Sequence, residues 1–169
     1  MAAKTTKPGV LILIDNSDAK LAMIPKELLE GVRVVNSSTL NQLELVTKLK
    51  QLTPHGRGLD VALDCVGNET VVNTAYEALG KMAMLLNIGG NPTAKPHFNI
   101  ERNLVNGLTI RGTHQGDSVS REMIPRLIQM WRDGQFPFDK LLTKFRFEEL
   151  DRAIEEVHKG NVIKPLLVT

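Results

Sequence analysis

Apolar runs of strand length alternate with helical patterns along the chain, and this alternation restricts the fold more than any other feature of the sequence. The apolar runs cover residues 10–14, 32–35, 61–66, 83–88, 108–111 and 162–168. Continuous apolar runs are typical of strands that are buried on both faces, as in parallel sheets. Their alternation with helices predicts an α/β fold with a mainly parallel sheet flanked by helices.

Amphipathic patterns with a helical period fill most of the intervals between these runs. They cover residues 17–28, 40–52, 68–80, 118–134 and 147–158. Asn68 is typical of a helix N-cap, whereas Gly80 and Gly134 are typical of helix ends. Pro25 falls inside the first pattern, so that helix is expected to start, kink or break there.

Composition excludes several kinds of protein. The 169 residues carry 21 basic and 19 acidic side chains, a near balance that argues against a nucleic-acid-binding surface. The densest basic group, Lys4 to Lys7, is interpreted as part of a solvated tail, residues 1–9, before one domain at residues 10–169. No apolar run reaches the roughly 20 residues of a membrane span. Because Cys65 is the single cysteine, a reducing compartment such as the cytoplasm is expected.

Glycine and small polar residues gather where the predicted strands end. These strand ends are Asp15, Asn36–Ser38, Asp64–Gly67, Asn87–Gly90 and Gly112–Gln115. Open α/β sheets bind ligands at the carboxyl ends of their strands, and glycine lets a backbone approach a ligand closely. Such turns are rich in glycine and asparagine in any case, so each turn taken alone leaves both interpretations open.

Five stretches considered together are more specific. They read IDNSDAKL, GLDVALDCVGN, ALGKMAMLLNIGG, LTIRGTHQGDSV and, at the C-terminus, IPRLIQMWRDGQFPFDKL continuing to NVIKPLLV. In these stretches the chain resembles the second half of zinc-type, medium-chain alcohol dehydrogenases, and the aryl- or benzyl-alcohol branch in particular. The resemblance implies an incomplete Rossmann-like domain of a kind that binds NAD(H).

The same resemblance implies roles for nine residues. Asp15 matches the acid that binds the adenosine ribose and favours NAD over the phosphorylated cofactor, although it could instead cap the next helix. Lys20 matches a basic residue beside that ribose. The other matched positions are Cys65 and Val66 in the adenine and ribose groove, Ile88, Gly89, Gly112 and Thr113 near the nicotinamide, and Lys164 near the pyrophosphate. Cys65 could also be a small core residue, and the two lysines ordinary surface charges.

Several parts that the family's chemistry requires are missing from the 169 residues. A glycine-rich phosphate loop lies about 20 residues before the ribose-binding acid, but only Gly9 occurs among the fourteen residues before Asp15. Zinc needs about four clustered ligands, and one cysteine with four separated histidines has no such spacing. We therefore expect no zinc site, no required cofactor, weak NAD binding at most, and no zinc-dependent hydride transfer by this chain alone.

The first strand of the order 3-2-1-4-5-6 is also missing. Two strands and three strands would then flank an empty position. Unpaired buried backbone groups cost about 1–3 kcal/mol each, so the gap is expected to close. The N-terminal run, a neighbouring chain or a new pairing of the sheet could fill it.

Three functions stay open, and with them the question whether the chain is an enzyme. One is a non-redox enzyme of the isomerase, dehydratase or cyclase type that binds a small organic molecule in the former cofactor cleft. Its acid–base residue would be His114 oriented by Asp117, with Asp64 and Asn87 as alternates, although His114 could be an ordinary loop histidine. The second is an NAD(H)-binding oxidoreductase domain. The third is a module that forms a homodimer through the edge strand near residues 106–113, which in the family pairs with its own copy.

Overall fold

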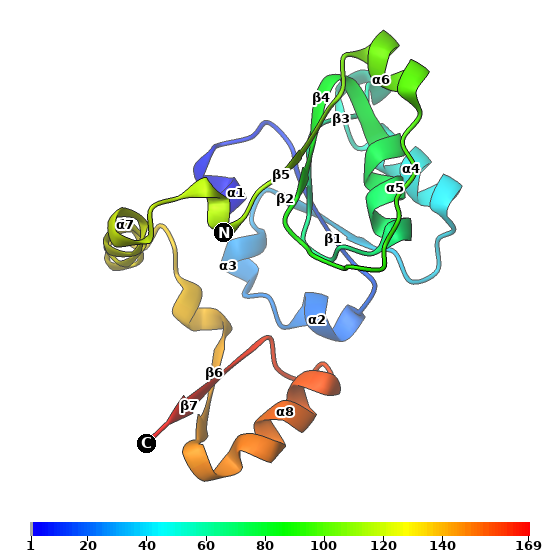
Figure 1. The fold of residues 1–169 in the computed structure, drawn as a ribbon. Coiled ribbons are helices and arrows are strands. Elements are labelled where there is room, and N and C mark those ends of the chain that lie inside the picture. The colour runs from blue at the N-terminus through cyan, green and yellow to red at the C-terminus, as the bar shows by residue number, and fades with distance from the viewer. Residues whose placement is uncertain (1) are drawn as a thin grey trace. The chain divides into compact units, whose positions relative to one another are not determined.

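A computed structural model describes residues 2–169 of the chain, and every strand pair in it is parallel. The described strands form three sheets, with the orders β1-β2, β3-β4-β5 and β6-β7 (Figure 1). The chain divides into two compact units, Met1–Thr39 with Val119–Thr169, and Leu40–Ser118. The prediction of a mainly parallel α/β fold is confirmed. A group of two strands, β1-β2, and a group of three, β3-β4-β5, are present, but no described strand pairs with both, so the expected closure of the gap between them is not seen.

The unit Leu40–Ser118 is a three-stranded sheet with helices packed against it. Its elements are α4 (Gln42–Gln51), η1 (Pro54–Gly56), β3 (Leu59–Asp64), α5 (Glu69–Ala78), β4 (Leu79–Asn87), α6 (Ile100–Asn106), β5 (Thr109–Gly112) and η2 (Gln115–Asp117). In Figure 1, α5 lies along β3 and β4, and α4 packs against α5. The connections from β3 through α5 to β4 and from β4 through α6 to β5 are the βαβ crossovers that parallel neighbours require.

The core of this unit lies between α5 and the sheet. Leu85 on β4 and Tyr76 on α5 are almost fully buried, and the remaining buried members are Ala62, Val72, Leu79 and Ala83. The predicted N-cap of α5 is confirmed, because the side chain of Asn68 accepts hydrogen bonds from the Thr70 and Val71 backbone N–H groups. The helix ends one residue earlier than Gly80 indicates, since the chain enters β4 directly at Leu79.

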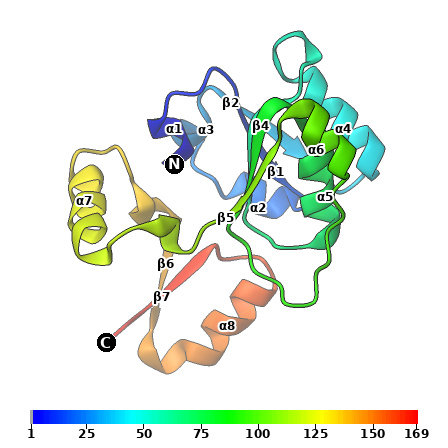
Figure 2. The same cartoon turned by 45° about the horizontal axis from the view of Figure 1, so that its top comes forward.

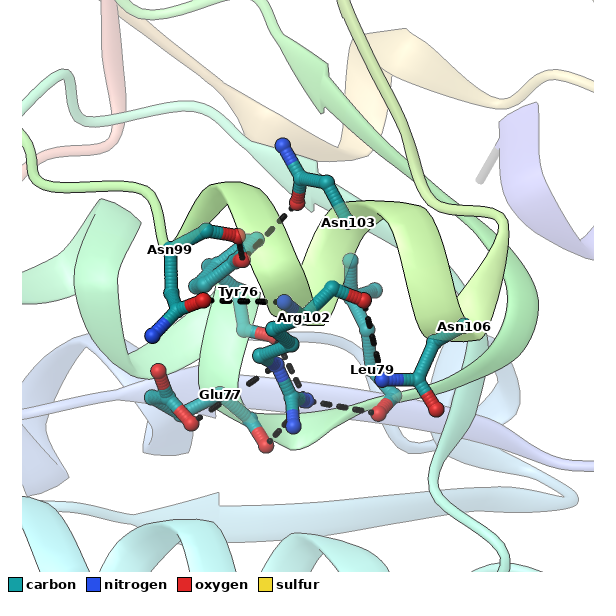
Figure 3. A network of polar contacts seen from close by, with 7 residues as sticks. All are labelled: Tyr76, Glu77, Leu79, Asn99, Arg102, Asn103 and Asn106. Carbon is teal, nitrogen blue, oxygen red and sulfur yellow. Dashed lines mark hydrogen bonds and ion pairs between the residues drawn. The ribbon is translucent and has the colours of Figure 1, made fainter.

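Arg102 on α6 closes the C-terminal end of α5 (Figure 3). Its Nη2 atom donates to the backbone oxygens of Tyr76, Glu77 and Leu79 at 3.4, 3.2 and 3.1 Å. Helices leave their last carbonyls without partners, and here one guanidinium serves three of them. The Tyr76 hydroxyl lies 3.0 Å from the Asn99 backbone oxygen and 2.8 Å from Oδ1 of Asn103, two acceptors for its one proton. Long-range polar contacts therefore fix α6 against α5.

The N-terminal part of the other unit is a βαβ segment. Its elements are α1 (Ala2–Thr5), β1 (Leu11–Asp15), α2 (Asp18–Ala22), α3 (Lys26–Leu29) and β2 (Val32–Asn36). Pro25 separates the two short helices, as its place in the sequence predicts. In the predicted tail Lys7 is exposed, whereas Lys4 is half-buried. Its Nζ atom donates to the backbone oxygens of Leu28 and Glu30 at 3.3 and 2.9 Å, where α3 ends.

The C-terminal part of that unit holds a second βαβ segment. Its elements are α7 (Ser120–Arg132), η3 (Phe138–Leu141), β6 (Leu142–Arg146), η4 (Phe147–Glu149), α8 (Leu150–His158) and β7 (Lys164–Val168). Figure 2 shows β6 beside β7 with α8 packed along them. A small core of Phe145, Ala153 and Val162 holds these elements together. No buried residue lies on α7, and Trp131 on it is 41% exposed.

Among the elements that the sequence patterns did not predict are α1, α6 and β6. In α6, Ile100 and Leu104 are more than four-fifths exposed, so this helix lacks the inward apolar stripe by which a helix is recognised. In β6, the sequence LTKFR alternates and contains two cations, unlike the continuous apolar runs. No helix within residues 2–169 is long and apolar enough to cross a membrane.

Candidate functional site

Three turns meet at the carboxyl ends of β3, β4 and β5. The backbone N–H groups of Ile88 and Gly89 donate to the Asp64 backbone oxygen at 2.8 and 2.9 Å, and Thr113 N–H donates to the Asn87 backbone oxygen at 3.1 Å. The turns after the three strands are therefore joined through the backbone. We call residues 64–67, 87–90 and 112–114 the turn cluster. It contains six of the nine implied cofactor positions, Cys65, Val66, Ile88, Gly89, Gly112 and Thr113.

The Asp64 carboxylate lies inside the first of these turns. The residue is 2% exposed, and its Oδ1 accepts hydrogen bonds from the N–H groups of Val66 and Gly67 at 3.0 and 3.1 Å. Its Oδ2 accepts a further bond from the Gly67 N–H at 3.0 Å. A carboxylate that accepts backbone N–H bonds in a tight turn fixes the conformation of that turn. This geometry favours a positioning role for Asp64 over direct proton transfer to a ligand.

The first two turns approach each other at two glycines. Gly67 has φ +75°, a conformation in which a side chain is strained. A Cβ atom placed on Gly89 would lie 2.4 Å from the Gly67 nitrogen, closer than any side chain tolerates. Two apolar residues beside these glycines stay accessible, because Val66 is 62% and Ile88 50% exposed. The turn cluster thus presents two exposed apolar side chains on turns whose backbones are held together by hydrogen bonds.

Cys65 and Asn87 lie two residues before Gly67 and Gly89 in the sequence. Partial burial, and secondly the negative charge of Asp64, raise the pKa of the Cys65 thiol above its ordinary value. The thiol is therefore protonated near neutral pH and is a weak nucleophile. The Oδ1 atom of Asn87 is buried and has no hydrogen-bond partner among the described residues. An amide oxygen in this state can accept a hydrogen bond from water or from a ligand.

The turn after β5 carries the predicted pair His114 and Asp117, and both are exposed. The Asp117 carboxylate bonds Nη2 of Arg111 at 2.8 Å and accepts a long hydrogen bond, 3.4 Å, from the His114 backbone N–H. The Arg111 guanidinium and that backbone N–H hold the pKa of Asp117 below its ordinary value. Asp117 thus contacts the backbone of His114, and its charged partner is Arg111, which the sequence analysis did not single out.

The other implied cofactor positions, Asp15, Lys20 and Lys164, belong to the other compact unit. Asp15 ends β1, and its Oδ1 accepts a hydrogen bond from the Ser17 N–H at 2.9 Å. The N-cap of α2 is Ser17, whose side chain accepts from the Lys20 N–H, so Asp15 is not the capping residue. The side chains of Lys20 and Lys164 are exposed. A ribose-binding role for Asp15 stays a prediction.

A zinc ion does not fit the side chains of the described chain. Among residues 2–169, no group of three or more histidine, cysteine, aspartate or glutamate side chains is placed to hold a metal ion. A zinc centre needs about four nitrogen, sulfur or oxygen ligands around one point.

Parallel βαβ units with glycine-rich turns at their strand ends define an α/β domain of the Rossmann-like, nucleotide-binding class. Residues 1–132 match the family described as zinc-binding dehydrogenase. The chain belongs to this family, and its matched region is the C-terminal, NAD-binding half of zinc-type alcohol dehydrogenases.

Individual relatives agree with this assignment. Geraniol dehydrogenase of Castellaniella defragrans is 32% identical over 126 residues, which are 74% of this chain and 33% of the relative. The crystal structure of benzyl alcohol dehydrogenase from Acinetobacter calcoaceticus superposes with a TM-score of 0.88 at 27% identity, covering 98% of this chain and 44% of the other. An alcohol dehydrogenase zinc-binding domain protein of Burkholderia ambifaria gives 0.87 at 30% identity, covering 98% of this chain and 43% of that protein. The chain thus spans less than half of each relative.

Proposed function

We propose that the chain binds a small organic molecule at the turn cluster, and that NAD(H) is the first ligand to test there. The observation that carries the proposal is the backbone bonding of the three turns, which leaves Val66 and Ile88 exposed beside close-packed glycines. Exposed apolar side chains on turns that are fixed by their own hydrogen bonds offer a preformed surface to a flat ligand. Membership of a dehydrogenase family supports the choice of a nicotinamide nucleotide.

The affinity for the whole dinucleotide is proposed to be weak, in about the millimolar range. The pyrophosphate of NAD is ordinarily held by a glycine-rich turn at a helix N-terminus, and Gly9 is the one glycine before β1 in these 169 residues. The side chains present offer no zinc ligand set. Zinc-dependent hydride transfer is therefore not part of what we propose for this chain by itself.

An alternative is that the chain serves as the NAD(H)-binding part of a dehydrogenase whose other residues lie outside this sequence. The names of the similar proteins favour it, since geraniol dehydrogenase and benzyl alcohol dehydrogenase are both named for alcohols with large apolar groups. The substrate class proposed for such an enzyme is a primary alcohol, or its aldehyde, attached to an aromatic or terpenoid group.

A non-redox reaction at the turn cluster is supported by His114. Its imidazole is exposed on the turn that follows Thr113, and the ion pair of Arg111 with Asp117 holds that turn. A histidine there could move a proton to or from a bound ligand near neutral pH. A ligand that contacts the imidazole would change the NMR titration curve of His114. An unchanged curve in the ligand-saturated protein would remove His114 from the site.

We further propose that two copies of the chain pair through β5. Among the described strands β5 bonds to β4 alone, so one edge of β5 has no strand beside it. An unprotected edge is a template for pairing with another chain. Exposed apolar side chains on the preceding α6, Leu104 at 81% and Val105 at 69%, would be covered in the same association.

Because Cys65 is its only thiol, the chain suits a reducing compartment such as the cytoplasm, and we propose that location.

The binding proposal is tested by titrating NADH into the protein and following the fluorescence of the reduced nicotinamide. A Val66→Asp variant places a negative charge on the turn cluster and is expected to lower the affinity about tenfold or more, because phosphates and carboxylates repel each other. Leu43→Asp on α4 is the matched control, since Leu43 is 75% exposed and lies outside the cluster. Equal affinities of the two variants would contradict the proposed site.

A further inference from the structure

We infer that Asp64 is the positioning residue of the turn cluster, one side chain whose carboxylate sets the geometry of two ligand-facing turns. Its carboxylate binds the N–H groups of Val66 and Gly67, and its backbone oxygen binds those of Ile88 and Gly89. A single residue therefore accepts hydrogen bonds from four backbone N–H groups, those of two neighbouring residues in each turn. The effect on ligand binding rests on the function proposed above, whereas the effect on the turns does not.

The carboxylate acts directly on the turn after β3. It is 2% exposed, so its hydrogen bonds to Val66 and Gly67 are shielded from water. Charge-assisted bonds of this kind are stronger than bonds between neutral groups, and burial keeps solvent from replacing them. Without the carboxylate, the buried N–H group of Gly67 and the part-buried N–H group of Val66 lose their partner, and the turn is expected to relax.

The effect reaches the turn after β4 through close backbone contact. Gly89 packs so tightly on Gly67 and Val66 that the nearest atoms to a Cβ on Gly89 would be the Gly67 nitrogen and the Val66 backbone. A shift of Gly67 toward Gly89 is therefore expected to displace Gly89. The exposed side chains of Val66 and Ile88 lie next to these glycines in sequence, so both would lose their fixed position.

This role differs from that of a catalytic acid or base. An acid–base role needs a carboxyl group that exchanges a proton, and Asp64→Asn would abolish it. A positioning role needs an acceptor oxygen at the place of Oδ1, which accepts from both Val66 and Gly67, and the asparagine amide oxygen can supply it. Asp64→Asn keeps that one acceptor but loses the charge and the Oδ2 acceptor of Gly67, so its effect should be smaller than that of Asp64→Ala.

The decisive experiment is amide hydrogen exchange of the ligand-free chain, measured residue by residue by NMR. Asp64→Ala is expected to speed exchange at Val66, Gly67 and Gly89 about tenfold or more, as the loss of a charge-assisted bond implies. Asp64→Asn is expected to stay within about threefold of the wild type. Asp60→Ala is the control, because Asp60 is exposed on the same strand. Unchanged exchange in Asp64→Ala, or equal effects of Ala and Asn, would overturn the inference.

Asp64→Glu covers the case in which Asp64→Ala does not fold. It keeps the charge but moves it by one methylene group, so the amide hydrogens of the two turns should again exchange faster. Exchange at the wild-type rate would overturn the inference.

NADH titration of the same variants is interpreted separately. If the wild type does not bind NADH while the exchange results are as expected, the proposed ligand is wrong and the role of Asp64 stands. If it binds, Asp64→Ala should weaken binding about tenfold, and Asp64→Asn should not.

Discussion

Gly89 lies directly against the backbone of Gly67, with no space for a side chain between the turns that follow β3 and β4. Gly89→Ala would place its Cβ atom 2.4 Å from the Gly67 nitrogen, so the backbone must move. We expect a loss of about 1–3 kcal/mol in the free energy of unfolding, as for other overpacked sites, measured by urea denaturation. Gly90→Ala is the control, because a Cβ atom there meets nothing within 4 Å. Similar losses in both variants would contradict the close contact.

Arg102 is expected to contribute more to stability than any exposed arginine of the same unit. Arg102→Ala removes the donor that serves three carbonyls at the end of α5 and the cation that lies 5.3 Å from the centre of the Tyr76 ring. A loss of about 2 kcal/mol should follow, and Arg102→Lys should recover only part of it, because an ammonium lacks the planar fork. Arg57→Ala, on an exposed side chain, should stay within about 0.5 kcal/mol of the wild type. No difference between Arg102→Ala and Arg57→Ala would refute this role.

The ion pair of Arg111 with Asp117 predicts a pH dependence. Because the folded-state pKa of Asp117 is lowered, its contribution to stability is present above the unfolded pKa and is lost as the pH falls through the folded pKa. Arg111→Gln should raise the pKa of Asp117 toward its ordinary value, which carbon NMR of the carboxyl group measures. Glu149, whose pKa is lowered by the Arg146 backbone and by Arg152, is an internal control and should not change. An Asp117 titration unaffected by Arg111→Gln would exclude the pair in solution.

The proposed pairing through β5 predicts a dimer that charge disrupts. Leu104→Asp, on the exposed face of α6, should convert the dimer to a monomer at micromolar concentration in size-exclusion light scattering, with an unchanged circular dichroism spectrum. The matched control is Leu43→Asp, because Leu43 is similarly exposed on α4. A wild-type chain that is monomeric under these conditions would contradict the proposed interface.

The sequence predicted most of the regular structure because its strong signals are local. The apolar runs mark six of the seven strands within a few residues, and Asn68 and Pro25 mark helix boundaries where the structure has them. What it missed depends on contacts distant in sequence. Gly80 looked like a helix end, yet it lies in β4, because the last carbonyls of α5 are closed by Arg102, which lies 23 residues beyond Leu79.

The candidate site was predicted in part for the same reason. Glycines and polar residues at strand ends indicated the turn cluster, and six of the nine implied positions lie there. The partners within it were not predictable from spacing. Asp117 was expected to orient the His114 imidazole, whereas its carboxylate binds Arg111 six residues earlier and the His114 backbone. Asp64 was predicted as an alternative acid or base. Its near-complete burial inside a turn could not be predicted, because the burial depends on the packing of the turns.

The most direct test of the central claim is an amide chemical-shift titration of isotope-labelled protein with NADH. If the turn cluster binds NADH, the amide signals of Val66, Ile88, Gly89 and Thr113 should move together and saturate with a dissociation constant in about the millimolar range. The proposed site would be contradicted if these signals did not move up to the highest soluble concentration of NADH. Shifts confined to residues outside 64–67, 87–90 and 112–114 would contradict it as well.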